Sequence, residues 1–172
     1  ALVTRQMPTI ATTGAGEDEA HDLWRSAEAK YEQKRWAEQS EKALYQDVAF
    51  KRYQASVDKA LAKFENVAEW ADFISFLTRL LKALQTSSAS YHVIPTKLVV
   101  AKRLSQCLNP ALPSGVHTRA LEVYMYIFTA IGVDGLRRDL QVWTPGLLPL
   151  FPHAATSVRP VVLDIYERFI LT

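Results

Sequence analysis

The chain has 172 residues, 49% hydrophobic and 22% charged, a composition that excludes a largely disordered or fibrous protein. Twenty Lys and Arg against eighteen Asp and Glu give a net charge of +2, far from the strongly basic balance typical of nucleic-acid-binding proteins. The single cysteine, Cys107, excludes an intramolecular disulfide and indicates a reducing compartment such as the cytosol. We therefore expect one folded domain and no nucleic-acid partner.

The N-terminal part of the chain begins without any apolar period. Residues 1–16 mix Thr, Gly, Pro and Ala, which predicts a flexible lead-in to a helical domain over 17–172. Residues 17–45 are rich in good helix formers, and their acidic start suits the positive end of a helix dipole. Because apolar residues are sparse there, we expect either one long, partly exposed helix or two segments broken near 39–46. The aromatic residues of this stretch are either core or anchors for a partner: Trp24, Tyr31 and Trp36.

Three amphipathic helices are predicted in the middle of the chain. The first covers 48–64, and the third covers about 95–108, with Cys107 on its apolar side as a buried structural thiol. The second begins after Asn66 as the N-cap, with Glu69 at the third helical position, where a capping box places a carboxylate. Its apolar residues span about 160° of the helix surface. Such a wide stripe contacts more than one neighbour, as in layered helices.

Four further helical segments are predicted after the proline-containing loop 109–114. Ser114 caps the first of them, and Gly132 ends it. Three shorter elements follow, opened by Asp134, by Thr144 and by a residue near 157. The loop itself is either a simple connection or a rigid, exposed contact segment.

No alternating apolar pattern competes with these helices, so we predict an all-α fold of antiparallel helix pairs. The pattern fits a closed bundle or a right-handed superhelix of armadillo or HEAT type. We favour the superhelix, because the chain starts at Ala1 and stops at Thr172 on an uncapped apolar stripe, as expected for a piece of a longer stack. Residues 140–158 carry no Asp, Glu, Lys or Arg, but three prolines argue against a membrane span.

Charged and nucleophilic residues form no catalytic pattern in the sequence. The histidines are scattered without metal-ligand spacing, at His21, His92, His117 and His153. Asp134 and Asp139 flank two arginines, so we expect a solvated ion-pair surface there rather than paired catalytic carboxylates. We expect no catalytic residue, no metal and no cofactor.

Two adjacent basic pairs are the candidate surface for an anionic lipid or a partner. Lys102 and Arg103 lie on the polar side of their helix, and Arg137 and Arg138 form the second pair. Two such charges contribute about 2 kcal/mol at an anionic membrane surface. That is too little for recruitment by one pair, and an ordinary solvated face is the alternative.

Three stretches resemble, in the same order, the N-terminal region of the Dopey proteins. They are VDKALAKFENVAEWADFISFLTRLLKALQ at 57–85, LVVAKRLSQCLNPALPSGVHTRALEVYMYIF at 98–128 and IGVDGLRRDLQVWTPGLLPLFPHAATSVRPVVLDIYERF at 131–169. The most distinctive segment is NPALPSGVH at 109–117. The likeness covers about 53–171.

The resemblance implies a very large scaffold protein, not an enzyme, that acts in traffic between endosomes and the trans-Golgi network. It also implies a place on the cytosolic face of Golgi, trans-Golgi network and endosome membranes. The implied partners are a large Golgi protein related to the Arf-exchange factors, a lipid flippase of the type-IV P-type ATPase class and the kinesin motor. We therefore expect a scaffold or adaptor domain, with a phosphoinositide-binding recruitment module as the alternative.

Overall fold

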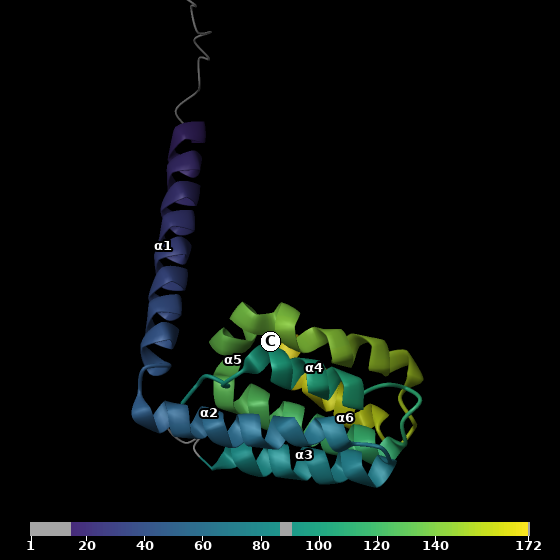
Figure 1. The fold of residues 1–172 in the computed structure, drawn as a ribbon. Helices are drawn as coiled ribbons and strands as arrows, with labels where there is room; N and C mark the ends of the chain where they lie inside the picture. The colour runs from purple at the N-terminus through teal and green to yellow at the C-terminus, as the bar shows by residue number, and fades with distance from the viewer. Residues whose placement is uncertain (1–14, 87–90, 172) are drawn as a thin grey trace, which may run out of the picture. The chain divides into compact units, whose positions relative to one another are not determined.

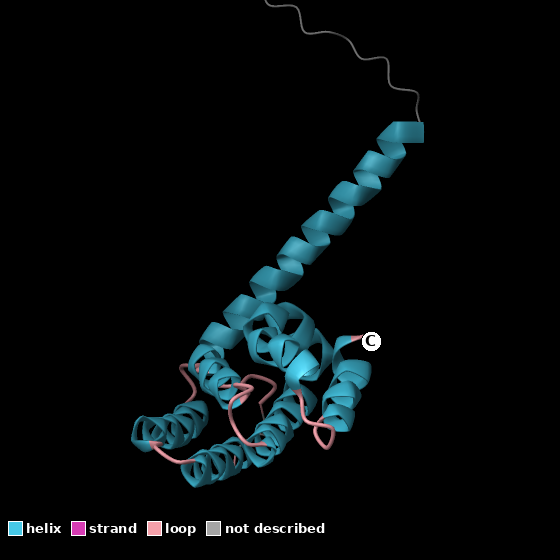
Figure 2. Cartoon of the chain, turned by 90° about the vertical axis from the view of Figure 1, so that its right-hand side faces the viewer, coloured by secondary structure: helices cyan, strands magenta, loops and turns pink. Residues whose placement is uncertain are grey.

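The computed structural model describes residues 15–86 and 91–171, with side chains from Asp22 onward. Within these ranges the chain consists of helices joined by turns and loops, without a strand (Figure 2), so the predicted all-α class is confirmed. The chain divides into two compact units, a first unit at Ala1–Tyr45 and a second unit at Gln46–Thr172. The boundary lies inside the helical domain expected over 17–172. The predicted lead-in falls outside the described residues up to residue 14, and its last two residues already belong to a helix.

The described part of the first unit is one helix, α1 (Ala15–Leu44), which is drawn in purple and blue in Figure 1. It is unbroken because Ala, Glu, Lys, Gln and Arg dominate its sequence and no proline interrupts it. The alternative of one long, partly exposed helix is therefore confirmed. This helix ends at Leu44, within the range 39–46 in which the other alternative places a break. Its described side chains are mostly exposed, as its thin apolar content requires.

Successive helices of the second unit run in opposite directions, as predicted (Figure 1). Helices α2 and α3 lie side by side, α4 packs against α5, and α5 also contacts α3 and α6. The right-handed superhelix of armadillo or HEAT type stays a prediction. The elements in chain order are α2 (Val48–Leu61), the 3-10 turn η1 (Ala62–Asn66), α3 (Trp70–Gln85), α4 (Lys97–Cys107), α5 (Ser114–His153), α6 (Arg159–Ile165) and the π-helical turn η3 (Tyr166–Ile170).

Helix α3 begins later than the sequence pattern predicts. Its N-cap is Glu69, and the carboxylate of Asp72 accepts a hydrogen bond from the Glu69 backbone N–H at 3.0 Å, which completes a capping box. The predicted N-cap, Asn66, is wrong because it belongs to η1, the turn that prolongs α2. Packing fixes this turn, since the ring of Phe64 meets that of Phe76 edge to face at 5.0 Å between centroids.

Helix α5 contains two breaks. Gly132 has φ 70° and ψ 178°, a backbone conformation open almost only to glycine, and it ends the first half as predicted. The second break is at Asp139, with φ −106° and ψ 16°. The element predicted to open at Thr144 is wrong, because this residue lies inside the helix and its hydroxyl donates to the Leu140 carbonyl at 2.9 Å. The helical segment after the breaks accommodates Pro145, Pro149 and Pro152.

The core of the second unit lies where α3 and α4 pack against α5. The rings of Tyr124 and Trp143 each meet the ring of Phe128 edge to face, at 5.7 and 6.5 Å between centroids. Cys107 is fully buried, which confirms the predicted core thiol. Gly146 marks a close approach of α5 to α4, since a Cβ there would lie 2.7 Å from the Ser105 Cα. None of the described helices combines the length and the apolar content that crossing a bilayer requires.

Candidate functional site

The three aromatic residues predicted as core or anchors of α1 are exposed. Trp24, Tyr31 and Trp36 keep 75%, 64% and 70% of their surface accessible, so the core alternative is wrong for all three. Trp24 and Tyr31 are seven residues apart and share one side of α1, whereas Trp36 lies about 120° around the helix from Trp24. The structure therefore brings two of them onto one stripe and leaves the third off it. Their role as partner anchors stays a prediction.

The first predicted basic pair is divided between an internal contact and the solvent. Arg103 forms an ion pair with Glu65, and its guanidinium carbon lies 4.5 Å from the centre of the Phe64 ring. The same guanidinium donates to the Gln106 side chain at 3.1 Å. Arg103 therefore ties α4 to η1. Lys102 is exposed and is the member of the pair available to a ligand.

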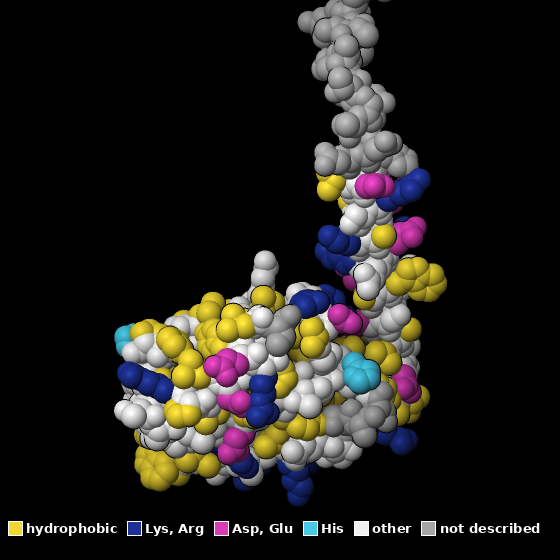
Figure 3. All heavy atoms as spheres, turned by 180° about the vertical axis from the view of Figure 1, so that it is seen from behind, with side chains coloured by type: hydrophobic (Ala, Val, Ile, Leu, Met, Phe, Trp, Pro, Cys, Tyr) yellow, Lys and Arg dark blue, Asp and Glu magenta, His cyan; other side chains and the backbone are white. Residues whose placement is uncertain are grey.

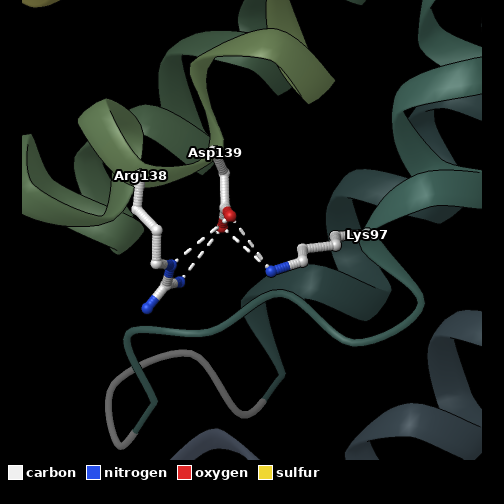
Figure 4. A network of polar contacts seen from close by, with 3 residues as sticks. All are labelled: Lys97, Arg138 and Asp139. Carbon is white, nitrogen blue, oxygen red and sulfur yellow. Dashed lines mark hydrogen bonds and ion pairs between the residues drawn. The ribbon is translucent and has the colours of Figure 1, made fainter. Parts of the chain in front are cut away.

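In the second predicted basic pair, Arg138 belongs to a polar network (Figure 4). Its guanidinium donates to the carboxylate of Asp139 at 3.0 Å, and the Lys97 ammonium lies 3.1 Å from both oxygens of that carboxylate. Only 11% of the Asp139 side chain is exposed, so the solvated ion-pair surface expected at Asp134 and Asp139 is wrong for Asp139. Arg137 is exposed.

Lys97, Arg138 and Asp139 form an ion-pair network, the Asp139 joint, whose role is structural. Burial acts to raise its pKa, but the hydrogen bonds and charges of Arg138 and Lys97 outweigh burial and hold the pKa below its ordinary range. The carboxylate is therefore ionised at neutral pH, and it connects the start of α4 to the second break of α5. Sequence reasoning missed this joint because Lys97 and Asp139 are 42 residues apart and belong to no common pattern.

A buried histidine of α5, His117, forms a hydrogen bond with the loop 109–114. His117 is 3% exposed, and its Nε2 lies 2.8 Å from the Asn109 carbonyl oxygen. Because a carbonyl only accepts hydrogen bonds, Nε2 carries the proton and donates it. The Asn109 side chain in turn accepts from the Ala111 backbone N–H at 3.0 Å. These bonds connect the loop to α5 and within itself, and its role as a contact segment stays a prediction.

The remaining reactive groups show no arrangement for catalysis or metal binding within the described residues. Burial raises the pKa of the Cys107 thiol to about 12, so it is not a nucleophile at neutral pH. Across 22–86 and 91–171, no three His, Cys, Asp or Glu side chains form a group that could hold a metal ion. On the face shown in Figure 3, basic and acidic side chains of the second unit stand beside one another among hydrophobic ones.

Comparison with known proteins places this all-α domain in a family. The family model described as "Dopey, N-terminal" matches residues 47–172, which is the second unit without its first residue. "Protein dop1" from Emericella nidulans is 51% identical over 131 residues, 76% of this chain and 7% of that protein. "Protein DOP1B" from Mus musculus is 49% identical over 131 residues, 76% of this chain and 6% of that protein. "Protein DOP1" from Saccharomyces cerevisiae is 44% identical over 125 residues, 70% of this chain and 7% of that protein. No solved structure matches.

The chain belongs to the Dopey family and contains its N-terminal region. It spans only 5–7% of the length of the curated relatives it matches. None of the names of these relatives is an enzyme designation. The match starts at residue 47, so α1 lies before it, and the family comparison carries no information about the exposed aromatic residues of that helix.

Proposed function

We propose that the second unit is a non-enzymatic scaffold domain of a large peripheral membrane protein that acts in vesicle traffic between endosomes and the trans-Golgi network. Membership of the Dopey family is the observation that carries this proposal. The domain would work on the cytosolic face of these membranes by binding other trafficking proteins. The whole protein's proposed partners are a large Golgi protein related to the Arf-exchange factors, a lipid flippase and kinesin.

The distribution of buried and exposed side chains supports a role in binding other proteins. The ionised groups of the Asp139 joint and of Arg103 stabilise the stack itself, and Cys107 is buried. Several large apolar side chains instead remain exposed on α4 and α5. Leu98 keeps 68% of its surface accessible, and Leu148 keeps 54%. Exposed apolar residues of this kind suit protein contacts, particularly where they adjoin polar side chains.

The alternative is a module that recruits the protein to phosphoinositides or other anionic lipids. The internal pairing of Arg103 and Arg138 weakens it, since these predicted basic residues are engaged within the domain. Flotation with vesicles that contain or lack phosphatidylinositol 4-phosphate tests it. Flotation that depends on this lipid and is lost with Lys102→Glu would favour the alternative.

Affinity recovery from cell extract with the immobilised full chain tests the scaffold proposal. We expect enrichment of Golgi and endosomal proteins, identified by quantitative mass spectrometry. The chain with Gly146→Val, whose core is disrupted, serves as the control, and proteins that it recovers equally well are discounted. Failure of the folded chain to enrich any protein of these compartments would contradict the proposal.

A further inference from the structure

A groove between α2 and α3 is lined by four basic side chains and by no acidic one. Its volume is about 340 Å³. Lys59 and Lys63 line it from the α2 side, and Arg79 and Lys82 line it from α3, which lies alongside (Figure 1). Two small side chains, Ala60 and Ala83, complete the apolar part of its wall and leave its centre open. No other basic cluster described above has this composition, because each of those contains a carboxylate.

The four cations of this basic groove are not neutralised by the fold. All four side chains are exposed, and none of them forms an ion pair with any described residue. In the same unit Arg103, Arg119 and Arg138 each pair with a carboxylate, whereas the groove gathers four cations that do not. Unpaired like charges along a concave surface raise its positive potential and attract anions.

The groove continues beyond these residues along the helices. A second hollow, of about 300 Å³, shares Lys63 and Arg79 with it and reaches Asn66 and Ser75. The acidic residue of this hollow is Asp72, whose carboxylate is already an acceptor of the backbone N–H groups that cap α3. These hydrogen bonds lower the pKa of Asp72, so its carboxylate stays negatively charged and disfavours a second carboxylate in this hollow. The part of the groove that favours an anionic ligand is therefore the part lined by Lys59, Lys63, Arg79 and Lys82.

The length of the groove distinguishes between anionic ligands. From Ser56 to Lys63 the chain advances about 11 Å along α2 and η1 at helical rise. That distance exceeds a single phosphate group and equals about three residues of an extended chain. Cations in two rows, one on each helix, would meet carboxylates on both sides of such a chain, while the alanines leave room for its backbone.

We propose that this basic groove binds an acidic segment of a protein partner. The inference deepens the proposed scaffold function, on which it rests, by assigning a surface and a chemical class of ligand. Association is driven by charge, so it weakens as salt rises.

Fluorescence anisotropy of a fluorescein-labelled hexaglutamate peptide, titrated with the full chain at low and physiological salt, tests the proposal. We expect saturable binding that the double variant Lys63→Glu, Arg79→Glu weakens by about tenfold or more, since each reversed charge changes several exposed ion pairs. The matched control is Lys34→Glu, Lys51→Glu, which changes the net charge equally at two exposed cations that do not line the groove. The control should bind like the parent chain.

Absence of binding, or an equal loss in the groove variant and the control, overturns the proposal. Vesicles of phosphatidylcholine with phosphatidylserine distinguish the other source of negative charge. Flotation that the groove variant abolishes, without any binding of hexaglutamate, would make the groove a membrane site and would also overturn the proposal. Neither result touches the recovery of Golgi and endosomal proteins, so failure of this inference remains separable from failure of the scaffold function.

Folding of the groove variant is checked by thermal unfolding. The two substituted positions, Lys63 and Arg79, are exposed and lie among like charges, so the melting temperature should stay unchanged or rise. If it falls, the milder variant Lys59→Gln, Lys82→Gln replaces it in the same peptide titration. Because this variant removes two positive charges without reversing them, the expected loss is about threefold relative to the control Lys34→Gln, Lys51→Gln.

Discussion

The two compact units of the chain are helical for different reasons. In α1 good helix formers follow one another for 30 residues, and the described side chains stay mostly exposed. In the second unit the helices carry prolines, glycines and internal breaks, and a shared core of buried aromatic and aliphatic side chains fixes where each one begins and ends. Substitutions in the second unit should therefore cost stability according to packing, whereas substitutions in α1 should not.

The largest effect is expected at Gly146, where α5 lies against the backbone of α4. A valine there would place its Cβ 2.7 Å from the Ser105 Cα, so the helices would have to move apart. We expect a loss of about 3 kcal/mol in the free energy of unfolding, measured by urea unfolding followed by circular dichroism. The matched control is Gly115→Val on the same helix, where the nearest atom to a Cβ is the Ile74 Cδ1 at 4.0 Å. Equal losses at both positions would contradict the packing argument.

A smaller effect is expected at Gly132, where the backbone and not the packing is decisive. Nothing lies within 4 Å of a Cβ added there, yet its φ of 70° disfavours every other residue. Gly132→Ala should cost about 2 kcal/mol, measured by the same urea unfolding. Gly115→Ala is the control and should be close to neutral, and a neutral Gly132→Ala would show that α5 can turn without this conformation.

Asp139→Asn should cost about 1.5 kcal/mol at neutral pH, since the joint is only partly shielded from water. The pKa of Asp139 is lowered in the folded chain, so the carboxylate stabilises the fold above its unfolded pKa of about 3.9. This stabilisation is lost as pH falls through the lower, folded value. The difference between parent and variant should therefore shrink as pH falls from 7 to about 3. Asp134→Asn, at an exposed position, is the control, and a difference that grew in acid would contradict the sign of the shift.

The same contrast explains which features could be predicted from the sequence. Helix type and order follow from local periodicity, so the course of the chain from α2 to α4 and the break at Gly132 were predictable. The start of α3 was not, because both Asn66 and Glu69 can cap a helix and the packing of η1 decides between them. Contacts between distant segments, such as Lys97 with Asp139, carry no local signal.

The basic groove could be predicted from the sequence only in part. Each of its rows was visible in the sequence, since Lys59 and Lys63 are four residues apart and Arg79 and Lys82 are three apart, spacings that place both members on one helix face. What the sequence lacks is the pairing of α2 with α3 across the groove. On a single helix such a row of cations is typical of a solvated surface. The groove arises only because the row on α3 lies opposite the row on the α2 side, so that four unpaired cations line one concave surface.

The smallest effect is expected in α1, and it tests whether exposed side chains of this helix contribute little to stability. Because Trp24 and Tyr31 are exposed, replacing both by alanine removes little buried surface, and the better helix propensity of alanine offsets part of the loss. The free energy of unfolding of the second unit, followed through the near-ultraviolet circular dichroism of its buried aromatic residues, should change by less than about 0.5 kcal/mol. A double substitution at two core aromatic residues, Tyr124→Ala with Phe128→Ala, gives the opposite extreme. If the α1 variant unfolded as readily as the core variant, the exposed stripe would be part of the fold, and its proposed use as an anchor for a partner would have to be abandoned.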